Sequence, residues 1–371
     1  MKITVAGAGA MGCRFGAALF EAGHQVTLLD GWREHVTAIN EAGLRVTDET
    51  GTRTLPMTAV LFPDPPHQAQ DPARVTPGAA HPVPASLRPA ARPAQPPVAD
   101  NHPGDLVIVF AKATATAAVA AAANAAGAIG PSTLVLTLQN GLGNIEALLA
   151  HVPAARLLAG TTTLGTELLG PGHIRALGTG ETVLGPLPGA AGGPTATDGA
   201  GAFGDVATEA AERIAFALAE AGISVRVARN ALEAIWAKVA FNCVMNSLCS
   251  IASIPVSALA RYDGFDVLAG SVLDEVAAVA RAEGVTVDTG AALRVMQAQF
   301  DPSASGDHLA SLLQDLMNGR PTEIAQLNGA IAARAAARGI AAPVNATVSR
   351  LIGLLEATWT SRVNRVHPET L

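Results

Sequence analysis

Apolar and polar stretches alternate along the N-terminal part of the chain in a way that predicts strands and helices in turn. Residues 2–6 form a short β-branched run, and residues 10–22 are compatible with a helix that ends at Gly23. Residues 25–29 are typical of a second strand, and residues 34–41 of a second helix. This strand–helix–strand order predicts a parallel sheet with right-handed crossovers.

Residues 62–103 interrupt this pattern, because they hold twelve of the chain's 24 prolines. Proline has no amide donor and fixes φ at about −65°, so it fits neither a helix interior nor a sheet interior. We expect an extended or disordered insertion within the first domain, because strand signals resume after it. A surface loop can lengthen in this way at a modest entropic cost.

Strand and helix signals resume at residues 106–110, 133–138, 159–185, 206–220 and 224–227, with a flexible loop expected at 186–205. From Ala231 onward every signal is helical. The predicted fold class is therefore α/β, with an N-terminal Rossmann-type dinucleotide-binding domain over residues 1–229 and an all-helical C-terminal domain over residues 230–371.

We expect the dinucleotide to bind at the hexapeptide Gly7-Ala8-Gly9-Ala10-Met11-Gly12, between the first predicted strand and the first predicted helix. In that context a G-x-G-x-x-G motif is a dinucleotide-binding fingerprint. Gly7 would permit the tight turn, Gly9 the approach of a pyrophosphate to the helix N-terminus, and Gly12 close helix–strand packing. The alternative is a glycine-rich structural turn in another kind of α/β protein.

Asp30 ends the second predicted strand, downstream of Gly12. An acidic side chain at that place accepts hydrogen bonds from the adenosine ribose and repels a 2′-phosphate, which favours NAD. Arg33 and Arg14 are cations close in sequence that would offset this effect. The local sequence therefore leaves the choice between the two cofactors open.

Residues 231–251 form the most informative predicted helix, apolar on nearly every side and therefore buried. Lys238, Asn242 and Asn246 interrupt it at intervals of one helical turn, so they project from one face. A buried ammonium and two buried amides cost several kcal/mol, to order of magnitude, unless they find partners. They either form a structural network or line a cleft for a polar ligand.

A second polar cluster spans residues 308–324, and Thr322 and Glu323 follow Gly-Arg-Pro within it. The plain interpretation makes Thr322 a helix cap and Glu323 a first-turn acid favoured by the helix dipole.

Composition narrows the class of protein. Apolar residues make up 49% of the 371-residue chain, charged residues 15% and aromatic residues 4%, so the chain as a whole is not intrinsically disordered. At about 150 residues per domain, the length suggests two domains. The net charge of −7 argues against a nucleic-acid partner, which would require a basic surface.

Cys13, Cys243 and Cys249 are too few for a disulfide framework and lack metal-ligand spacing, so we expect no metal and a reducing compartment. No signal peptide is visible, because Gly7 stops the apolar run at residues 3–6. No window of about 18 apolar residues is typical of a membrane span. We expect a cytoplasmic protein without a membrane partner.

Together these features resemble the ketopantoate reductase (2-dehydropantoate 2-reductase) family over nearly the whole chain. The resemblance is carried by the Gly7–Gly12 fingerprint, Lys112, Gln139-Asn140-Gly141-Leu142-Gly143, Gly160-Thr161-Thr162-Thr163, Trp236-Ala237-Lys238 with Asn242 and Asn246, Ser311, Gly319-Arg320-Pro321-Thr322-Glu323-Ile324 and Leu327-Asn328-Gly329.

The resemblance implies a cleft between a Rossmann domain and a helical domain, where NADPH reduces 2-dehydropantoate to (R)-pantoate on the way to pantothenate. Lys238 matches the general acid that protonates the carbonyl oxygen. Asn242, Asn246 and Ser311 match residues that contact the substrate. These residue types suit the chemistry, because hydride transfer to a ketone builds negative charge on oxygen, which an ammonium stabilises.

The resemblance also implies the cofactor contacts. Glu323 matches a carboxylate at the cofactor and the substrate. Lys112, Asn140 and the main chain near Thr166 match positions around the nicotinamide half, and Asn140 would also face the substrate. The cofactor supplies the hydride, so the protein mainly orients the reactants.

Two departures from the family pattern stand out. Asp30-Gly31 replaces the basic residue with which many members hold the 2′-phosphate, which leaves NADH open beside NADPH. Val256 stands downstream of Asn246 where some members have an asparagine, so one substrate contact is missing.

The alternatives are a reductase of another 2-oxo acid, a non-catalytic dinucleotide-binding protein, or a metal site hidden among the nine histidines. A pure binding module would not need Lys238 beside two amides in an apolar helix. His151, His173 and His308 show no ligand spacing. Helical second domains often pair, which leaves a homodimer open.

Overall fold

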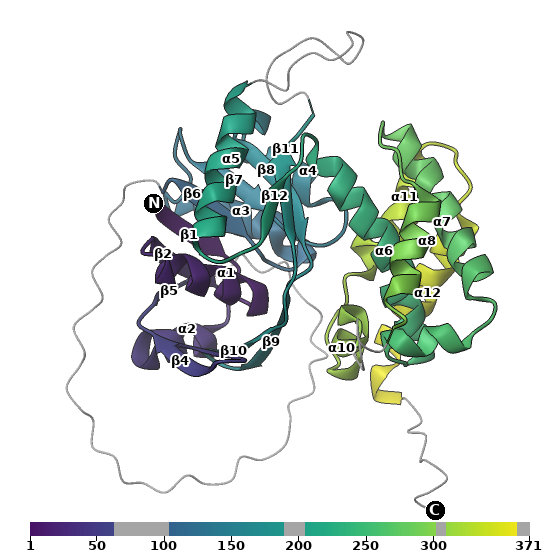
Figure 1. Ribbon diagram of the computed structural model, residues 1–371, viewed down its shortest axis with the longest axis horizontal. Coiled ribbons are helices and arrows are strands. Elements are labelled where there is room, and N and C mark those ends of the chain that lie inside the picture. The colour runs from purple at the N-terminus through teal and green to yellow at the C-terminus, as the bar shows by residue number, and fades with distance from the viewer. Residues whose placement is uncertain (63–103, 189–204, 302–308, 362–371) are drawn as a thin grey trace, which may run out of the picture.

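The computed structural model describes residues 1–62, 104–188, 205–301 and 309–361. The proline-rich insertion, apart from its first residue, and most of the expected loop at 186–205 lie outside these described residues. Figure 1 shows the sheet-containing part on one side and the helical part on the other, with α6 (Ala231–Ala252) leading between them.

The larger sheet has eight strands in the order β12-β11-β8-β7-β6-β1-β2-β5. Their bounds are β1 (Lys2–Ala6), β2 (Gln25–Asp30), β5 (Thr58–Leu61), β6 (Leu106–Val109), β7 (Leu134–Thr137), β8 (Leu157–Thr162), β11 (Thr182–Pro186) and β12 (Val225–Val227). All neighbours pair in parallel except β8 and β11. The chain runs outward from β1 in both directions, so a topological switch point lies between β1 and β6, where open α/β sheets bind ligands.

Helices cover both faces of this sheet. They are α1 (Ala10–Glu21), α2 (Arg33–Ala42), α3 (Thr116–Ala125), α4 (Asn144–Leu149) and α5 (Asp205–Glu220), with short 3-10 turns η1 (Ala113–Ala115) and η2 (Ala154–Arg156). One apolar core lies between the sheet and α1 and α5, and includes Phe15 and Ile214. The other joins the opposite face to α6 through Trp236, so the two parts share a continuous core.

A second sheet of four strands was not anticipated as a separate layer. It has the order β4-β3-β10-β9, from β3 (Leu44–Asp48), β4 (Gly51–Leu55), β9 (Gly165–Gly170) and β10 (His173–Leu177). The prediction of short strands over 159–185 is confirmed, but the hairpin at 44–55 was missed. Its partner β10 lies far away along the chain, so no local pattern reveals the pairing.

The helical part is built from α6, α7 (Phe265–Ala282), α8 (Thr289–Ala298), α10 (Ser311–Met317), α11 (Asn328–Ala337) and α12 (Pro343–Ala357), with η3 (Val256–Arg261), η4 (Ile324–Gln326) and η5 (Trp359–Ser361). No strand occurs in the described residues after β12, as predicted. The Asn230 side chain caps α6 by accepting a hydrogen bond from the Leu232 amide.

Within the described ranges, α6 is the one helix long and apolar enough to cross a membrane. The sequence analysis above expected no such segment. Because 72% of its most apolar window is buried inside the protein, core packing accounts for its hydrophobicity.

Candidate active site

The Gly7–Gly12 turn has the backbone geometry that a dinucleotide requires. Gly7 has φ +97°, and a Cβ there would lie 2.4 Å from the Ala111 amide nitrogen. A Cβ on Gly12 would lie 2.0 Å from the Gly7 carbonyl oxygen, whereas a Cβ on Gly9 would meet nothing within 4 Å. Gly7 and Gly12 therefore serve the turn itself, and the space over Gly9, at the start of α1, is open, as the predicted approach of a diphosphate requires. Ala8, Ala10 and Met11 complete the turn.

Asp30 lies at the end of β2, as predicted, and its Oδ1 accepts a hydrogen bond of 2.8 Å from the Trp32 amide. The Trp32 ring stacks on His35 with a centroid distance of 5.3 Å and an interplanar angle of 9°. This contact fixes the loop that carries Asp30, and Arg33 begins α2 as an exposed side chain. Position 30 thus presents an oriented carboxylate at the end of β2.

The Arg14 guanidinium is bonded to main-chain carbonyls. It donates to the carbonyls of Leu177 at 3.0 Å and Gly178 at 3.1 Å, and also to that of Gly165. These three carbonyls belong to the region of β9 and β10, so Arg14 joins α1 to the second sheet. Of the two cations considered for the 2′-phosphate, only Arg33 is left without such bonds in the described structure.

Lys238 projects from α6 toward the sheet domain, where its Nζ donates a hydrogen bond to the Thr162 carbonyl oxygen. Burial lowers the pKa of Lys238 to about 8, and the negative charge of Glu323 opposes that shift. Lys238 and Glu323, which are far apart in the chain, therefore belong to one electrostatic site. An amine with a pKa of about 8 is mostly protonated at neutral pH and still releases its proton readily.

Glu323 and the residues after it connect the helical part to the loops that follow the parallel strands. Its Oε1 accepts a hydrogen bond of 3.4 Å from the Ala113 amide, after β6. The Gln326 carbonyl accepts one of 2.8 Å from the Leu142 amide, after β7. Asn140 lies in this second loop, and its carbonyl is bound by the Asn144 side chain at 2.9 Å. The interpretation of Glu323 as a first-turn acid is thus incomplete, because its carboxylate contacts the other domain.

The polar stripe continues along α6 beyond Lys238. Asn246 is buried, and its Nδ2 donates to Ser311 Oγ on α10 at 3.2 Å. Asn242 is buried too, and within the described ranges its amide makes no hydrogen bond. This amide is therefore available to a polar ligand that lies beside Lys238.

Lys112 has a partner that the sequence did not suggest. Its Nζ lies 2.6 Å from Asp315 Oδ2 on α10, and Asp315 Oδ1 lies 3.2 Å from Arg320 Nε. Asp315 lies one turn after Ser311 on the same short helix, so the sequence spacing could have placed both on one face.

Thr166 is a predicted site residue that the described contacts do not connect to Lys238 or Glu323. It lies on β9, paired with Ala176, and its Oγ1 is buried without a hydrogen-bond partner in the described structure. Thr162 was not predicted as a site residue, but its carbonyl accepts the hydrogen bond from Lys238. A main-chain acceptor leaves no mark in the side-chain pattern.

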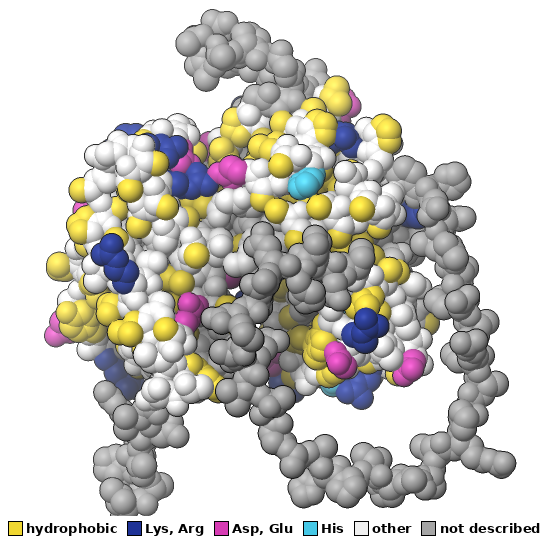
Figure 2. All heavy atoms as spheres, turned by 180° about the vertical axis from the view of Figure 1, so that it is seen from behind, with side chains coloured by type: hydrophobic (Ala, Val, Ile, Leu, Met, Phe, Trp, Pro, Cys, Tyr) yellow, Lys and Arg dark blue, Asp and Glu magenta, His cyan; other side chains and the backbone are white. Residues whose placement is uncertain are grey.

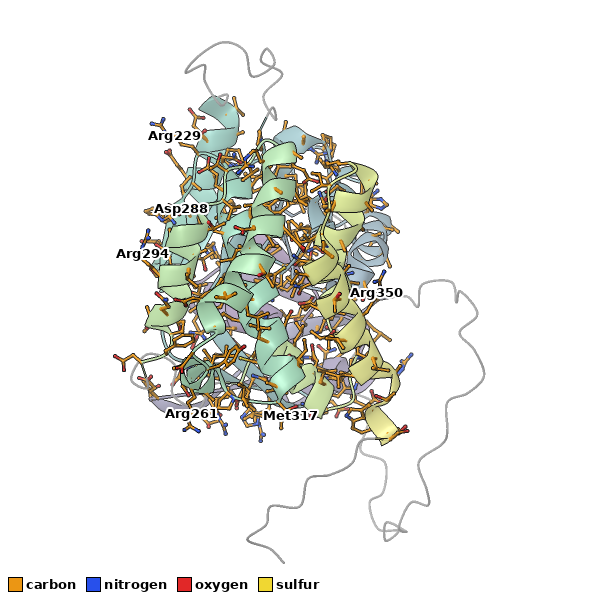
Figure 3. All side chains as sticks on the ribbon, turned by 90° about the vertical axis from the view of Figure 1, so that its right-hand side faces the viewer. Arg229, Arg261, Asp288, Arg294, Met317 and Arg350 are labelled. Atoms are coloured by element: carbon orange, nitrogen blue, oxygen red, sulfur yellow. The ribbon has the colours of Figure 1, made fainter. Side chains whose placement is uncertain are left out.

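The Lys238–Glu323 site differs from the outer surface of the protein. On the face seen in Figure 2, charged side chains are scattered among apolar and uncharged ones. Arg261, Arg294 and Arg350 lie at the rim of the helical part and point outward (Figure 3). Lys238 and Glu323 are partly buried, so their charges act in a less polar medium where they are worth more.

Comparisons with known proteins agree with this architecture. Residues 3–189 match the family described as "Ketopantoate reductase PanE/ApbA", and residues 230–356 match "Ketopantoate reductase PanE/ApbA C terminal". The chain is 30% identical over 353 residues to 2-dehydropantoate 2-reductase of Lactococcus lactis subsp. lactis, covering 95% of this chain and 97% of that one. It is 32% identical over 358 residues to the Halobacterium salinarum protein of the same name, covering 96% and 99%.

A solved structure gives the same result in three dimensions. The ternary structure of D-mandelate dehydrogenase with NADH and anilino(oxo)acetate superposes with a TM-score of 0.80 at 28% identity, covering 97% of this chain and 99% of that one. The glycine-rich turn and the Lys238–Glu323 pair agree with both family matches, which show that the chain belongs to the ketopantoate reductase PanE/ApbA family.

Proposed function

We propose that this chain reduces the ketone of 2-dehydropantoate to (R)-pantoate, a step toward pantothenate, with Lys238 as the general acid. At the level of the family, it is an NAD(P)H-dependent reductase of 2-oxo acids. The observation that carries the finer proposal is the position of Lys238. It is a partly buried amine with a pKa of about 8, close to Glu323, and it lies one helical turn before the buried Asn242.

In the proposed reaction, Lys238 donates a hydrogen bond to the ketone oxygen and then its proton, as negative charge builds on that oxygen. Asn140, Asn242, Asn246 and Ser311 hold the carboxylate and hydroxyl groups of the substrate. Glu323 keeps Lys238 charged until the proton moves.

The cofactor would lie along the glycine-rich turn, contacted by residues 7–12, Asp30, Arg33, Lys112, Asn140, the main chain near Thr166, and Glu323. When bound, its reduced nicotinamide supplies the hydride. The chain's own residues orient the two reactants and exclude water.

NADPH is the cofactor that the family resemblance implies, but Asp30 favours NADH. Its carboxylate is oriented by the Trp32 amide, and Arg14 is bonded to three carbonyls away from it. Arg33 would have to balance Asp30 for a 2′-phosphate to bind well. We therefore expect both cofactors to support turnover, with NADH rivalling NADPH.

A different 2-oxo acid is the second candidate substrate. The neighbour with the TM-score of 0.80 is named D-mandelate dehydrogenase, and its structure holds NADH. Val256, where some members have an asparagine, is buried in the apolar core at the start of η3, so it offers no polar contact. A pocket that lacks this contact would accept a less hydroxylated acid.

The decisive experiment is a substrate panel with both cofactors, followed by the absorbance of the reduced nicotinamide. Turnover of 2-dehydropantoate well above that of other 2-oxo acids would support the proposal. A preference for an aryl or alkyl 2-oxo acid would favour the second candidate. Absence of turnover with tight cofactor binding would favour a non-catalytic dinucleotide-binding protein.

We also propose residues 1–229 as the cofactor-binding domain and residues 230–371 as the substrate-binding domain, in a cytoplasmic enzyme. Cofactor binding by residues 1–229 expressed alone would test the division. The homodimer stays a prediction, which sedimentation velocity would test.

A further inference from the structure

Four polar groups form a continuous hydrogen-bonded chain that ends on the glycine-rich turn. The Gly172 amide, in the turn between β9 and β10, donates to His35 Nδ1 on α2 at 3.0 Å. His35 Nε2 lies 3.4 Å from Cys13 Sγ on α1. The Cys13 thiol donates to the Ala8 carbonyl at 3.0 Å. The chain therefore connects the second sheet, α2 and α1 to the turn where the dinucleotide is expected.

The proton positions in this chain follow from the chemistry of its members. Because the Gly172 amide donates to Nδ1, the proton of a neutral His35 ring lies on Nε2 and is directed at the sulfur. Burial lowers the pKa of His35, opposed by Asp30 and by the Ala8 carbonyl, so the ring is neutral at neutral pH. Burial raises the pKa of the Cys13 thiol, which keeps it protonated. Each link thus has one donor and one acceptor.

The end of the chain at the glycine-rich turn is closed off from solvent. His35 is 1% exposed, and Cys13 and Ala8 are fully buried. A trans peptide places its carbonyl and its N–H on opposite sides, so the bond to the Ala8 carbonyl also fixes the direction of the Gly9 amide. This peptide lies where the turn enters α1. Its orientation is therefore set from inside the protein, through Cys13.

We propose that Cys13 and His35 are positioning residues for the dinucleotide. The imidazole holds the thiol, and the thiol holds the Ala8–Gly9 peptide in the orientation that binds the diphosphate. Both side chains act from inside the protein, so neither would touch the cofactor itself. The inference rests on the proposed function for the place of the cofactor at the glycine-rich turn.

The thiol is tested by two variants that differ in one hydroxyl group. Serine and alanine are both smaller than cysteine, but only serine keeps a donor for the Ala8 carbonyl and an acceptor for His35. The probe is NAD⁺ or NADP⁺, whichever binds the wild-type full chain more tightly, in isothermal titration. Cys13→Ser should bind it within about twofold of the wild type, and Cys13→Ala about three- to tenfold more weakly, the range of one hydrogen bond. Cys249→Ala, which removes a buried thiol from α6, should lower the unfolding temperature without changing this affinity.

The imidazole is tested by a second pair. In His35→Gln the amide nitrogen takes the place of Nε2 and still donates to Cys13, whereas in His35→Asn the amide oxygen takes the place of Nδ1 and keeps only the bond from Gly172. Both variants lose the ring, so both should unfold at similarly lowered temperatures without cofactor. Only His35→Asn should bind the cofactor more weakly, again by about three- to tenfold. Combining it with Cys13→Ala should weaken binding no further than the larger single effect, because both break the same chain.

Weaker binding in Cys13→Ala and His35→Asn alone, with Cys13→Ser and His35→Gln close to the wild type, supports the proposal. Equal weakening within either pair overturns it, because lost packing would then explain the effect. Unchanged affinity in Cys13→Ala also overturns it, as do additive effects in the double variant. If the His35 variants do not fold, the Cys13 pair decides. If the wild type binds neither cofactor, the proposed function itself fails, and this inference with it.

Discussion

The two ends of the proposed cofactor site are built in opposite ways. The end at Gly7–Gly12 consists of six consecutive residues between β1 and α1, and their backbone would contact the cofactor. The catalytic end takes Lys238 from α6, Glu323 from the segment before η4 and the Thr162 carbonyl from β8. The proposed binding of the cofactor thus depends on local backbone shape, whereas the proposed chemistry depends on side chains that only the tertiary fold assembles.

The strongest test of this contrast is Lys238→Ala. Removing the proposed general acid should lower kcat by about 10²- to 10⁴-fold and leave the affinity for cofactor nearly unchanged. Steady-state kinetics and a cofactor titration measure the two quantities. Arg294→Ala, at the outer rim of the helical part (Figure 3), is the matched control and should behave as the wild type. Unchanged turnover in Lys238→Ala would reject the acid role.

Two glycine variants test the binding end from different sides. Gly9→Ala adds a methyl group where the chain leaves open space, so the free protein should keep its stability but lose about tenfold or more in cofactor affinity. Gly12→Ala places a methyl group against the Gly7 carbonyl and should destabilise the fold itself by about 1–3 kcal/mol. Thermal unfolding and cofactor titration separate them. Equal effects of both variants on stability would contradict the distinction.

The cofactor preference should respond to one carboxylate. Asp30→Asn removes the charge that repels a 2′-phosphate, so the ratio of kcat/KM for NADPH over NADH should rise about tenfold, or about 1.4 kcal/mol. Arg33→Ala, measured alongside, shows whether the neighbouring cation contributes. A wild-type preference for NADPH above about a hundredfold would mean that Arg33 or another cation outweighs Asp30.

The pH dependence gives the mildest test. The protonated amine is the active form in reduction, and burial lowers the pKa of Lys238 to about 8. The rate of ketone reduction should therefore be level below about pH 8 and fall about tenfold per pH unit above it. The reverse oxidation needs the neutral amine, so its rate should rise up to about pH 8 and then level off. A profile of kcat/KM in both directions measures this, and a reduction rate that increases from about pH 8 to about pH 9 would rule out the assignment.

Sequence patterns were sufficient for features that repeat over short distances. β1, α1 and β2 lie where the apolar runs and glycines place them, and the all-helical character after Ala231 follows from the loss of strand alternation. The one-turn spacing of Lys238, Asn242 and Asn246 was enough to put them on one face of one helix. Each of these features depends on contacts between residues a few positions apart. The local composition and the spacing of apolar residues therefore indicate them.

Features that depend on distant partners were decided only by the folded molecule. The hairpin β3–β4 joins β10 in a second sheet, Arg14 is bonded to carbonyls in the distant region of β9 and β10, and Asp315 pairs with Lys112 from another domain. Even the lowered pKa of Lys238 reflects burial by other elements, opposed by Glu323. Chain periodicity encodes which face of a helix or strand is apolar. Chain periodicity does not encode which other face, carbonyl or charge that face will contact, because those partners come together only when the whole core packs.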